Sequence, residues 1–302
     1  MSSVAASVGS ELEDVDAAPL ILQRALHPFI PPAAASRSVP CLEPDMIATR
    51  FRFASIARAL LLSSLSPAIA AAQTPAVPRF SALVEGASLW LARNDVRIPP
   101  DTGTEFSIVD LIGAGPTPTG RVEVTARVAS RHELRFVYAP IEISGTGVPT
   151  DAIAFAGQVF APGVATAAAY QFTSYRGTYR YTFYAGDRWQ WQIGFTGFVR
   201  DARIALGQAS VNAEDTDVGF VPLVHVRGRA ALGQRLRLTV EADGTAAPQG
   251  RAFDVAAMLD VNATPWWFIG GGYRTVEGGA DVDSVYNFAW LNAVVVRTGV
   301  MF

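Results

Sequence analysis

The sequence predicts an all-β fold, an antiparallel transmembrane β-barrel of about ten strands, preceded by a cleavable signal peptide. Three observations predict it. The chain has 302 residues, half of them apolar, yet only 17% are charged, against about a quarter in a typical soluble domain. No apolar run reaches the roughly 18 residues that a membrane-spanning helix needs. From residue 80 onward, apolar residues alternate with polar or small ones at a period of two, which is typical of strands with two different faces.

The first 72 residues are predicted to lie outside the barrel. The segment 59–72 is short, apolar and ends in small residues, and three basic residues precede it, as in a secretory signal peptide. These basic residues are Arg50, Arg52 and Arg58. We therefore expect a signal peptide at 46–72 and the barrel at 73–302. Residues 1–45 show no periodic pattern and are interpreted as a wrongly assigned start or a disordered extension. They contain Cys41, so the expected mature chain has no thiol.

Ten strands follow from the alternation. They are predicted at 80–93, 120–130, 133–144, 165–184, 188–206, 218–230, 234–244, 252–262, 266–275 and 285–302. Their connections alternate between tight turns and longer segments. An even number of strands with short turns at one end and longer loops at the other is typical of bacterial outer-membrane barrels, and it places both ends of the barrel at the periplasmic side. The segment 152–161 is interpreted as an extension within the second outer loop.

Aromatic residues gather near both ends of the predicted strands, as they do at the two boundaries between lipid and water. The outer group is predicted to contain Trp90, Tyr170, Phe172, Phe220, Phe253, Tyr273, Tyr286 and Phe288. In the last strand, the outward parity carries Tyr286, Phe288, Trp290 and Phe302. This strand resembles the C-terminal signature of bacterial outer-membrane proteins. The resemblance implies that these four residues form a membrane-insertion signal, which the barrel-assembly machinery reads.

Two further stretches are similar to a family of small bacterial outer-membrane β-barrel proteins that has no assigned activity. They are SYRGTYRYTF (174–183) and YRTVEGGADVDSVYNFAW (273–290). The resemblance implies a location in the cell outer membrane, after export through the periplasm, and contact with outer-membrane lipid and lipopolysaccharide.

Charged residues on the inward parity predict an ionic network in the lumen. Its expected members are Glu123, Arg176, Arg180, His225, Arg227, Arg229, Arg237, Glu241, Asp254 and Asp260. The same parity carries Glu85, Arg121, Arg127, Arg135, Arg274 and Arg297. Barrels of about eight strands are filled by side chains, whereas open channels need about sixteen. We therefore expect a largely plugged lumen. The alternative is a narrow passage that prefers anions, because arginines outnumber acids.

The residues predict no catalytic site, no cofactor and no metal site. After the leader, the histidines are His132, in an expected periplasmic turn, and His225, in the lumen. Neither G-x-S-x-G nor H-E-x-x-H occurs. The chain has no excess of basic residues, which argues against a nucleic-acid partner.

The outer connections carry two acidic clusters, which are interpreted as solvated loop residues. The clusters are Glu214, Asp215 and Asp217, and Glu277, Asp281 and Asp283. The functional prediction is a structural, adhesive or narrow-conductance role at the cell surface. The alternative is an outer-membrane enzyme that acts at the extracellular rim, resembling omptin proteases or lipid A-modifying hydrolases. Omptin-like chemistry requires histidine as well as acid there, and the predicted rim offers only acids.

Overall fold

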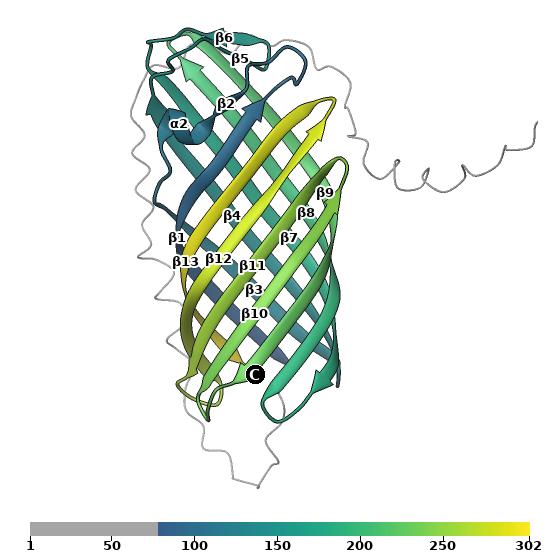
Figure 1. Cartoon of the computed structure of the whole chain (residues 1–302). Helices are drawn as coiled ribbons and strands as arrows, with labels where there is room; N and C mark the ends of the chain where they lie inside the picture. The colour runs from purple at the N-terminus through teal and green to yellow at the C-terminus, as the bar shows by residue number, and fades with distance from the viewer. Residues whose placement is uncertain (1–77) are drawn as a thin grey trace, which may run out of the picture. The chain divides into compact units, whose positions relative to one another are not determined.

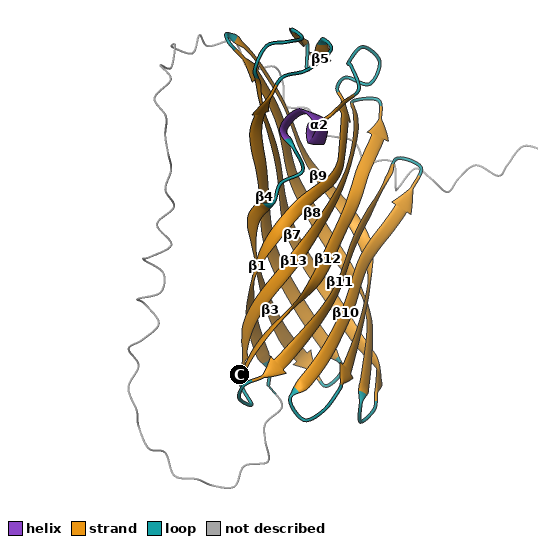
Figure 2. Ribbon diagram, turned by 60° about the vertical axis from the view of Figure 1, so that its left-hand side comes forward, coloured by secondary structure: helices purple, strands orange, loops and turns teal. Residues whose placement is uncertain are grey.

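Ten long strands hydrogen-bond to their neighbours in chain order, and the last strand pairs with the first to close a barrel (Figures 1 and 2). The computed structural model describes residues 78–302. The strands are β1 (Phe80–Arg97), β3 (Thr117–Ala129), β4 (His132–Gly147), β7 (Thr166–Ala185), β8 (Trp189–Gln208), β9 (Val211–Ala231), β10 (Leu236–Ala247), β11 (Gly250–Asn262), β12 (Trp267–Val282) and β13 (Val285–Met301). The prediction of a ten-stranded antiparallel barrel is therefore confirmed. The predicted signal peptide and the extension before it lie outside the described residues.

The outer connections hold four short elements. They are β2 (Phe106–Ser107), α2 (Ile108–Ile112), β5 (Ile153–Phe155) and β6 (Gln158–Phe160). The strands β5 and β6 form a separate two-stranded sheet, so the segment 152–161 belongs to the second outer loop, as predicted. Within the described residues, no helix has the length and apolar character needed to cross a membrane.

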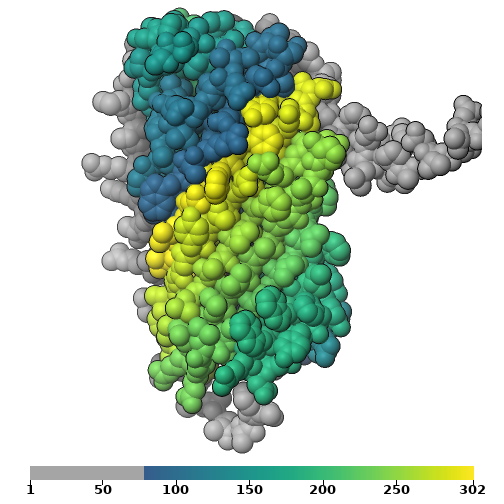
Figure 3. Space-filling view, viewed as in Figure 1, coloured from purple at the N-terminus to yellow at the C-terminus, as the bar shows by residue number. Residues whose placement is uncertain are grey.

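Side chains alternate between the two faces of the barrel wall along each strand. In β13, Val296 is 62% exposed on the outer face, whereas its neighbour Val295 is 2% exposed in the interior. Outward positions of the other strands also carry large apolar side chains, such as Phe136 and Phe195. Figure 3 shows the wall of β9–β13 and β1 as a continuous surface. An apolar outer face around a closed barrel is the surface of a protein that lies in the outer membrane, because lipid replaces water there.

Three connections that were predicted as longer outer loops are tight turns. The turns join β8 to β9 at 209–210, β10 to β11 at 248–249, and β12 to β13 at 283–284. Above the membrane the outward face of a strand meets water instead of lipid, so the apolar alternation that marks a membrane strand stops before the strand does. The strands β7, β8 and β9 have 20, 20 and 21 residues, about twice the 9–11 that span a bilayer.

The outer aromatic group also needs a correction. Tyr170 is 3% exposed, and Phe172 packs against the buried core. Both were predicted to face lipid. Even-numbered positions of β7 point into the barrel, and these two residues share that parity with Arg176 and Arg180. The inward face of β7 is thus apolar near the outer mouth and charged below.

The first outer loop completes the wall where β3 is short. The pairing of β3 with β4 ends at Val122 and Tyr138, while β4 continues to Gly147. The helix α2 lies between the upper parts of β1 and β4 (Figure 2). Ser107 caps the N-terminus of this helix, because its hydroxyl accepts a hydrogen bond from the Asp110 amide. A side chain at Gly147 would collide with the Leu111 carbonyl, so only glycine permits this close approach.

Candidate functional site

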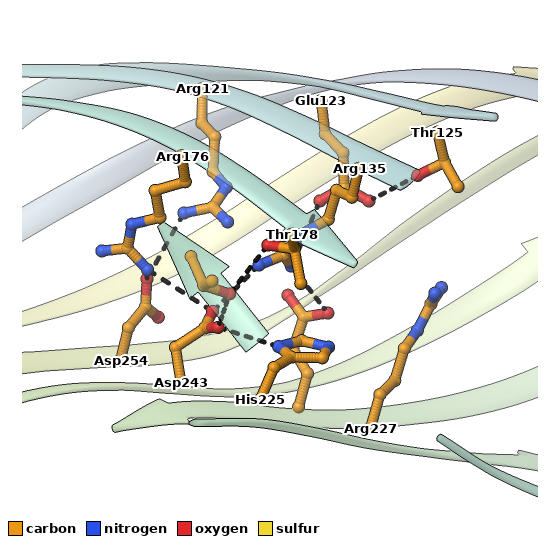
Figure 4. A network of polar contacts seen from close by, with 12 residues as sticks. Arg121, Glu123, Thr125, Arg135, Arg176, Thr178, His225, Arg227, Asp243 and Asp254 are labelled. Carbon is orange, nitrogen blue, oxygen red and sulfur yellow. Dashed lines mark hydrogen bonds and ion pairs between the residues drawn. The ribbon is translucent and has the colours of Figure 1, made fainter. Parts of the chain in front are cut away.

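The middle of the lumen holds a dense ionic network, which is the candidate site (Figure 4). One centre of the network is Asp254 on β11. Its two oxygens accept hydrogen bonds from Arg274 and Arg176, each at 2.7 Å, and a longer one from Arg121 at 3.4 Å. All four side chains are buried. Charge-assisted hydrogen bonds of this length are among the strongest polar contacts in proteins, so Asp254 ties β3, β7 and β12 to β11 across the barrel.

A second centre is Asp243 on β10. Arg135 donates to it at 2.9 Å and Thr196 donates at 2.6 Å, while Nδ1 of His225 lies 2.9 Å away. Arg176 lies 3.5 Å from the same carboxylate and so links the two centres. The Nε2 atom of His225 has no hydrogen-bond partner among the described residues. His225 is therefore a member of the network, held in place by Asp243.

Two further carboxylates join β1 and β13 to the network. Asp260 accepts two hydrogen bonds from Arg297, both at 2.8 Å, and two longer ones from Arg237, at 3.2 and 3.4 Å. Glu85 accepts a hydrogen bond from Arg274 at 3.1 Å and lies 3.6 Å from Arg297. The contacts cross the seam between the first and last strands, so the network also stabilises barrel closure.

The predicted network residues lie together in the interior, with one exception. Glu123 and Glu241 both lie near Arg135, at 3.7 and 3.4 Å. Arg180 and Arg227 both lie 3.7 Å from Glu133. The exception, Arg229, is half-buried and makes no ion pair within residues 78–302.

The sequence analysis missed two carboxylates of the network, Asp243 and Glu133. Their signal was present, because Asp243 shares the inward parity of Glu241 and Glu133 shares that of Arg135. It also missed the hydroxyl and amide side chains that complete the hydrogen bonds. These are Thr178, Thr182, Gln192 and Thr196.

An apolar layer fills the lumen above the ionic network, and it was not predicted. Its inward-facing strand residues include Leu89, Leu91, Ile143, Tyr170, Leu206, Leu291 and Val295. The outer loops add buried side chains from α2 and from the β5–β6 hairpin, namely Ile108, Leu111, Ile153, Phe155 and Phe160. The lumen therefore contains two filled layers, one charged and one apolar.

A cavity of about 50 Å³ lies between the two layers, lined by apolar residues above and by Arg121, Arg176 and Arg274 below. A buried water needs roughly 10–15 Å³ when volume is measured in this way. The cavity thus has room for a few water molecules.

Five of the six acids in the two rim clusters lie on strands and not in loops as predicted, whereas Asp283 lies in the turn between β12 and β13. Glu214 pairs with Arg203 at 2.8 Å and Glu277 pairs with Arg251 at 2.5 Å. A third cross-strand pair joins Asp217 to Arg200. Burial and the neighbouring Asp217 carboxylate raise the pKa of Asp215 above its ordinary value. Within residues 78–302, no group of three or more histidine, cysteine or acidic side chains is arranged to hold a metal ion.

Comparison with protein-family models and with characterised proteins finds no match for this chain. Solved structures do resemble it. The outer-membrane protease OmpT of Escherichia coli has a TM-score of 0.44 and 7% identity, over 74% of this chain and 97% of that one. Neisserial surface protein A has a TM-score of 0.34 and 11% identity, over 74% and 97%. The attachment invasion locus protein Ail of Yersinia pestis has a TM-score of 0.34 and 7% identity, over 75% and 100%.

Proposed function

We propose that this outer-membrane barrel does not conduct solutes, and that it acts at the cell surface through its folded outer part. The observation that carries the proposal is the double filling of the lumen. A layer of paired arginines and carboxylates closes the middle, and an apolar layer with two inserted loops closes the outer mouth. A water-filled passage would have to break buried ion pairs or hydrate an apolar core, and both are costly.

The part that projects from the membrane supports a role in surface contact. The hairpin of β8 and β9 rises above the shorter strands β10 and β11 (Figure 1). Cross-strand ion pairs join its two strands, and pairs of this kind contribute to the stability of a sheet. Gln208 fixes the second loop to this hairpin, because its amide donates to Thr166 at 2.7 Å and accepts from the Ala161 amide at 2.8 Å. The outer part is thus a rigid β-platform, suited to a structural or adhesive role.

The alternative, an outer-membrane enzyme acting at the rim, has less support. The histidines of the described residues are His132, at the periplasmic start of β4, and His225, in the ionic network. The rim acids Glu214, Asp217 and Glu277 are engaged with arginines of neighbouring strands. These carboxylates thus face arginines of the same sheet, and no histidine of the described residues lies beside them.

Planar-bilayer recording tests the proposal. We expect the purified, folded barrel to give no steady conductance, while a sixteen-stranded porin in the same bilayer conducts. Stable, anion-selective steps from the wild-type chain would contradict the closed lumen and would favour the narrow passage. The control is a heat-unfolded sample of the same preparation, which identifies current that arises from damaged membranes.

A further inference from the structure

Arginines and carboxylates of the lumen are matched in one group and unmatched in another. In one group, six arginines face six carboxylates. They are Arg121, Arg135, Arg176, Arg237, Arg274 and Arg297, with Glu85, Glu123, Glu241, Asp243, Asp254 and Asp260. In a second group, close to the periplasmic turns 130–131, 186–188 and 232–235, three arginines lie near one carboxylate, Glu133, and a fourth arginine, which makes no ion pair among residues 78–302, follows one of them on β9. We call these four the periplasmic arginine cluster, and they are Arg127, Arg180, Arg227 and Arg229. Counting Glu123 here, which lies 3.5 Å from Arg180, still leaves an excess of positive charge.

The contacts around Glu133 are too long to satisfy these arginines. Arg180 and Arg227 each place Nη1 3.7 Å from the same oxygen, Oε2, and Arg127 places Nη2 3.9 Å from Oε1. Hydrogen bonds between nitrogen and oxygen are usually 2.7–3.2 Å long. Arg180 is 0% exposed, and none of its three guanidinium nitrogens has a hydrogen-bond partner among residues 78–302. The Oε2 atom of Glu133 and the Nε atoms of Arg227 and Arg229 also lack partners.

Buried donors without acceptors are costly, and natural proteins nearly always satisfy them. Elsewhere in this lumen, for instance at Arg297 and Asp260, short paired hydrogen bonds do so. Arg121, Arg176 and Arg274 also have nitrogens without a hydrogen-bond partner, but each of these arginines donates to Asp254. Arg180 donates no side-chain hydrogen bond within the described residues, so the largest lack of acceptors in the described network is at this cluster, where the surplus charge is positive. We propose that the periplasmic arginine cluster binds a small oxyanion of the phosphate type, which enters from the periplasmic end.

The spacing and the accessibility of the cluster suit such a ligand. Because the Nη1 atoms of Arg180 and Arg227 lie 3.7 Å from one oxygen, they are at most twice that distance apart. A tetrahedral oxyanion can accept charge-assisted hydrogen bonds from both, since each such bond is about 2.8 Å long. Side-chain exposure rises from 0% at Arg180 to 8% at Arg227 and 29% at Arg127, which lies close to a periplasmic turn. The exposure of the cluster therefore increases toward the periplasmic turns, which is the side from which an anion would enter.

The test is the unfolding midpoint of the full-length barrel in detergent, measured with inorganic phosphate and with chloride at equal ionic strength. Phosphate stabilises many proteins without binding to them, so the comparison between variants carries the result. We expect a saturable rise of the midpoint in the wild type. Arg180→Gln should raise the half-saturating phosphate concentration about tenfold or more, because the variant loses a hydrogen bond to a charged group.

Two variants keep the test decisive. Glu133→Gln removes the competing carboxylate, so phosphate should bind more tightly than to the wild type. Arg297→Gln, the matched control, breaks the pair with Asp260 and should lower the midpoint while leaving the phosphate response unchanged. An equal phosphate response in the wild type, Arg180→Gln and Glu133→Gln would overturn the site.

A phosphorylated lipid headgroup offers the same oxygens as free phosphate. Titration with a short-chain phosphatidate in place of phosphate separates the two sources. A response to phosphatidate alone would refute the free oxyanion as the ligand. The inference goes beyond the closed-barrel function, because conductance can stay absent whether or not phosphate binds.

Discussion

Replacing Asp254 with asparagine is expected to lower the free energy of unfolding by about 3–5 kcal/mol, the cost of breaking a buried ion pair from one side. Asparagine has nearly the same shape, so the change removes charge with little change in volume. It leaves Arg176 and Arg274, both buried, without the carboxylate to which each donates at 2.7 Å. The measurement is urea-induced unfolding of the barrel in detergent micelles, followed by tryptophan fluorescence.

Glu277→Gln provides the control for Asp254→Asn. Glu277 pairs with Arg251 at the outer rim, where their side chains are 36% and 42% exposed. Exposed pairs contribute about 0–1 kcal/mol, so this variant should unfold almost as the wild type does. Equal losses in the two variants would mean that water screens the lumen charges, and the ionic plug would be wrong.

The second large effect concerns assembly. Changing Phe302 to aspartate should remove most of the folded, heat-modifiable form from the outer-membrane fraction. Phe302 is 68% exposed on the outer face and stacks on Phe80, with 5.9 Å between the ring centres. A charge there sits at the lipid boundary and alters the proposed insertion signal, which also includes Tyr286, Phe288 and Trp290. The measurement is gel migration of membrane fractions with and without heating.

The same substitution at Met301 is the matched control. Met301 has the opposite parity to Phe302, so its half-buried side chain is not part of the outward aromatic face. We expect Met301→Asp to assemble much better than Phe302→Asp. Equal assembly of the two variants would show that the outward aromatic face of the last strand is not what the assembly machinery recognises.

The barrel itself could be predicted because each membrane strand has one apolar and one polar face. Such a pattern repeats at a period of two and is visible without any tertiary information. The strand tips could not be predicted in this way. Residues such as Glu214 and Asp217 stand in water, where nothing requires an apolar face, and they look like loop residues in the sequence.

The charged layer of the lumen could be predicted from the alternation of inward and outward residues along each strand, whereas the apolar layer could not. Arg176 and Asp254 are conspicuous among inward positions, because a charge on a membrane strand has to face the interior. Leu291 and Val295 are also inward, yet an apolar residue on a membrane strand is expected to face lipid. Only the closed structure shows that they belong to one buried apolar cluster with side chains of α2 and of the β5–β6 hairpin, since the insertion of a loop depends on contacts between distant segments.

The claim that the lumen is filled can be tested most directly by labelling single cysteines with a water-soluble maleimide. Residues 78–302 contain no cysteine, so Val295→Cys and Ser210→Cys can each be made in a Cys41→Ser chain. Val295 is 2% exposed in the apolar layer, and Ser210 is exposed in the turn between β8 and β9. We expect the folded barrel to react at position 210 and not at position 295, and both positions to react after unfolding in urea. Equal labelling of the two positions in the folded barrel would contradict the closed lumen.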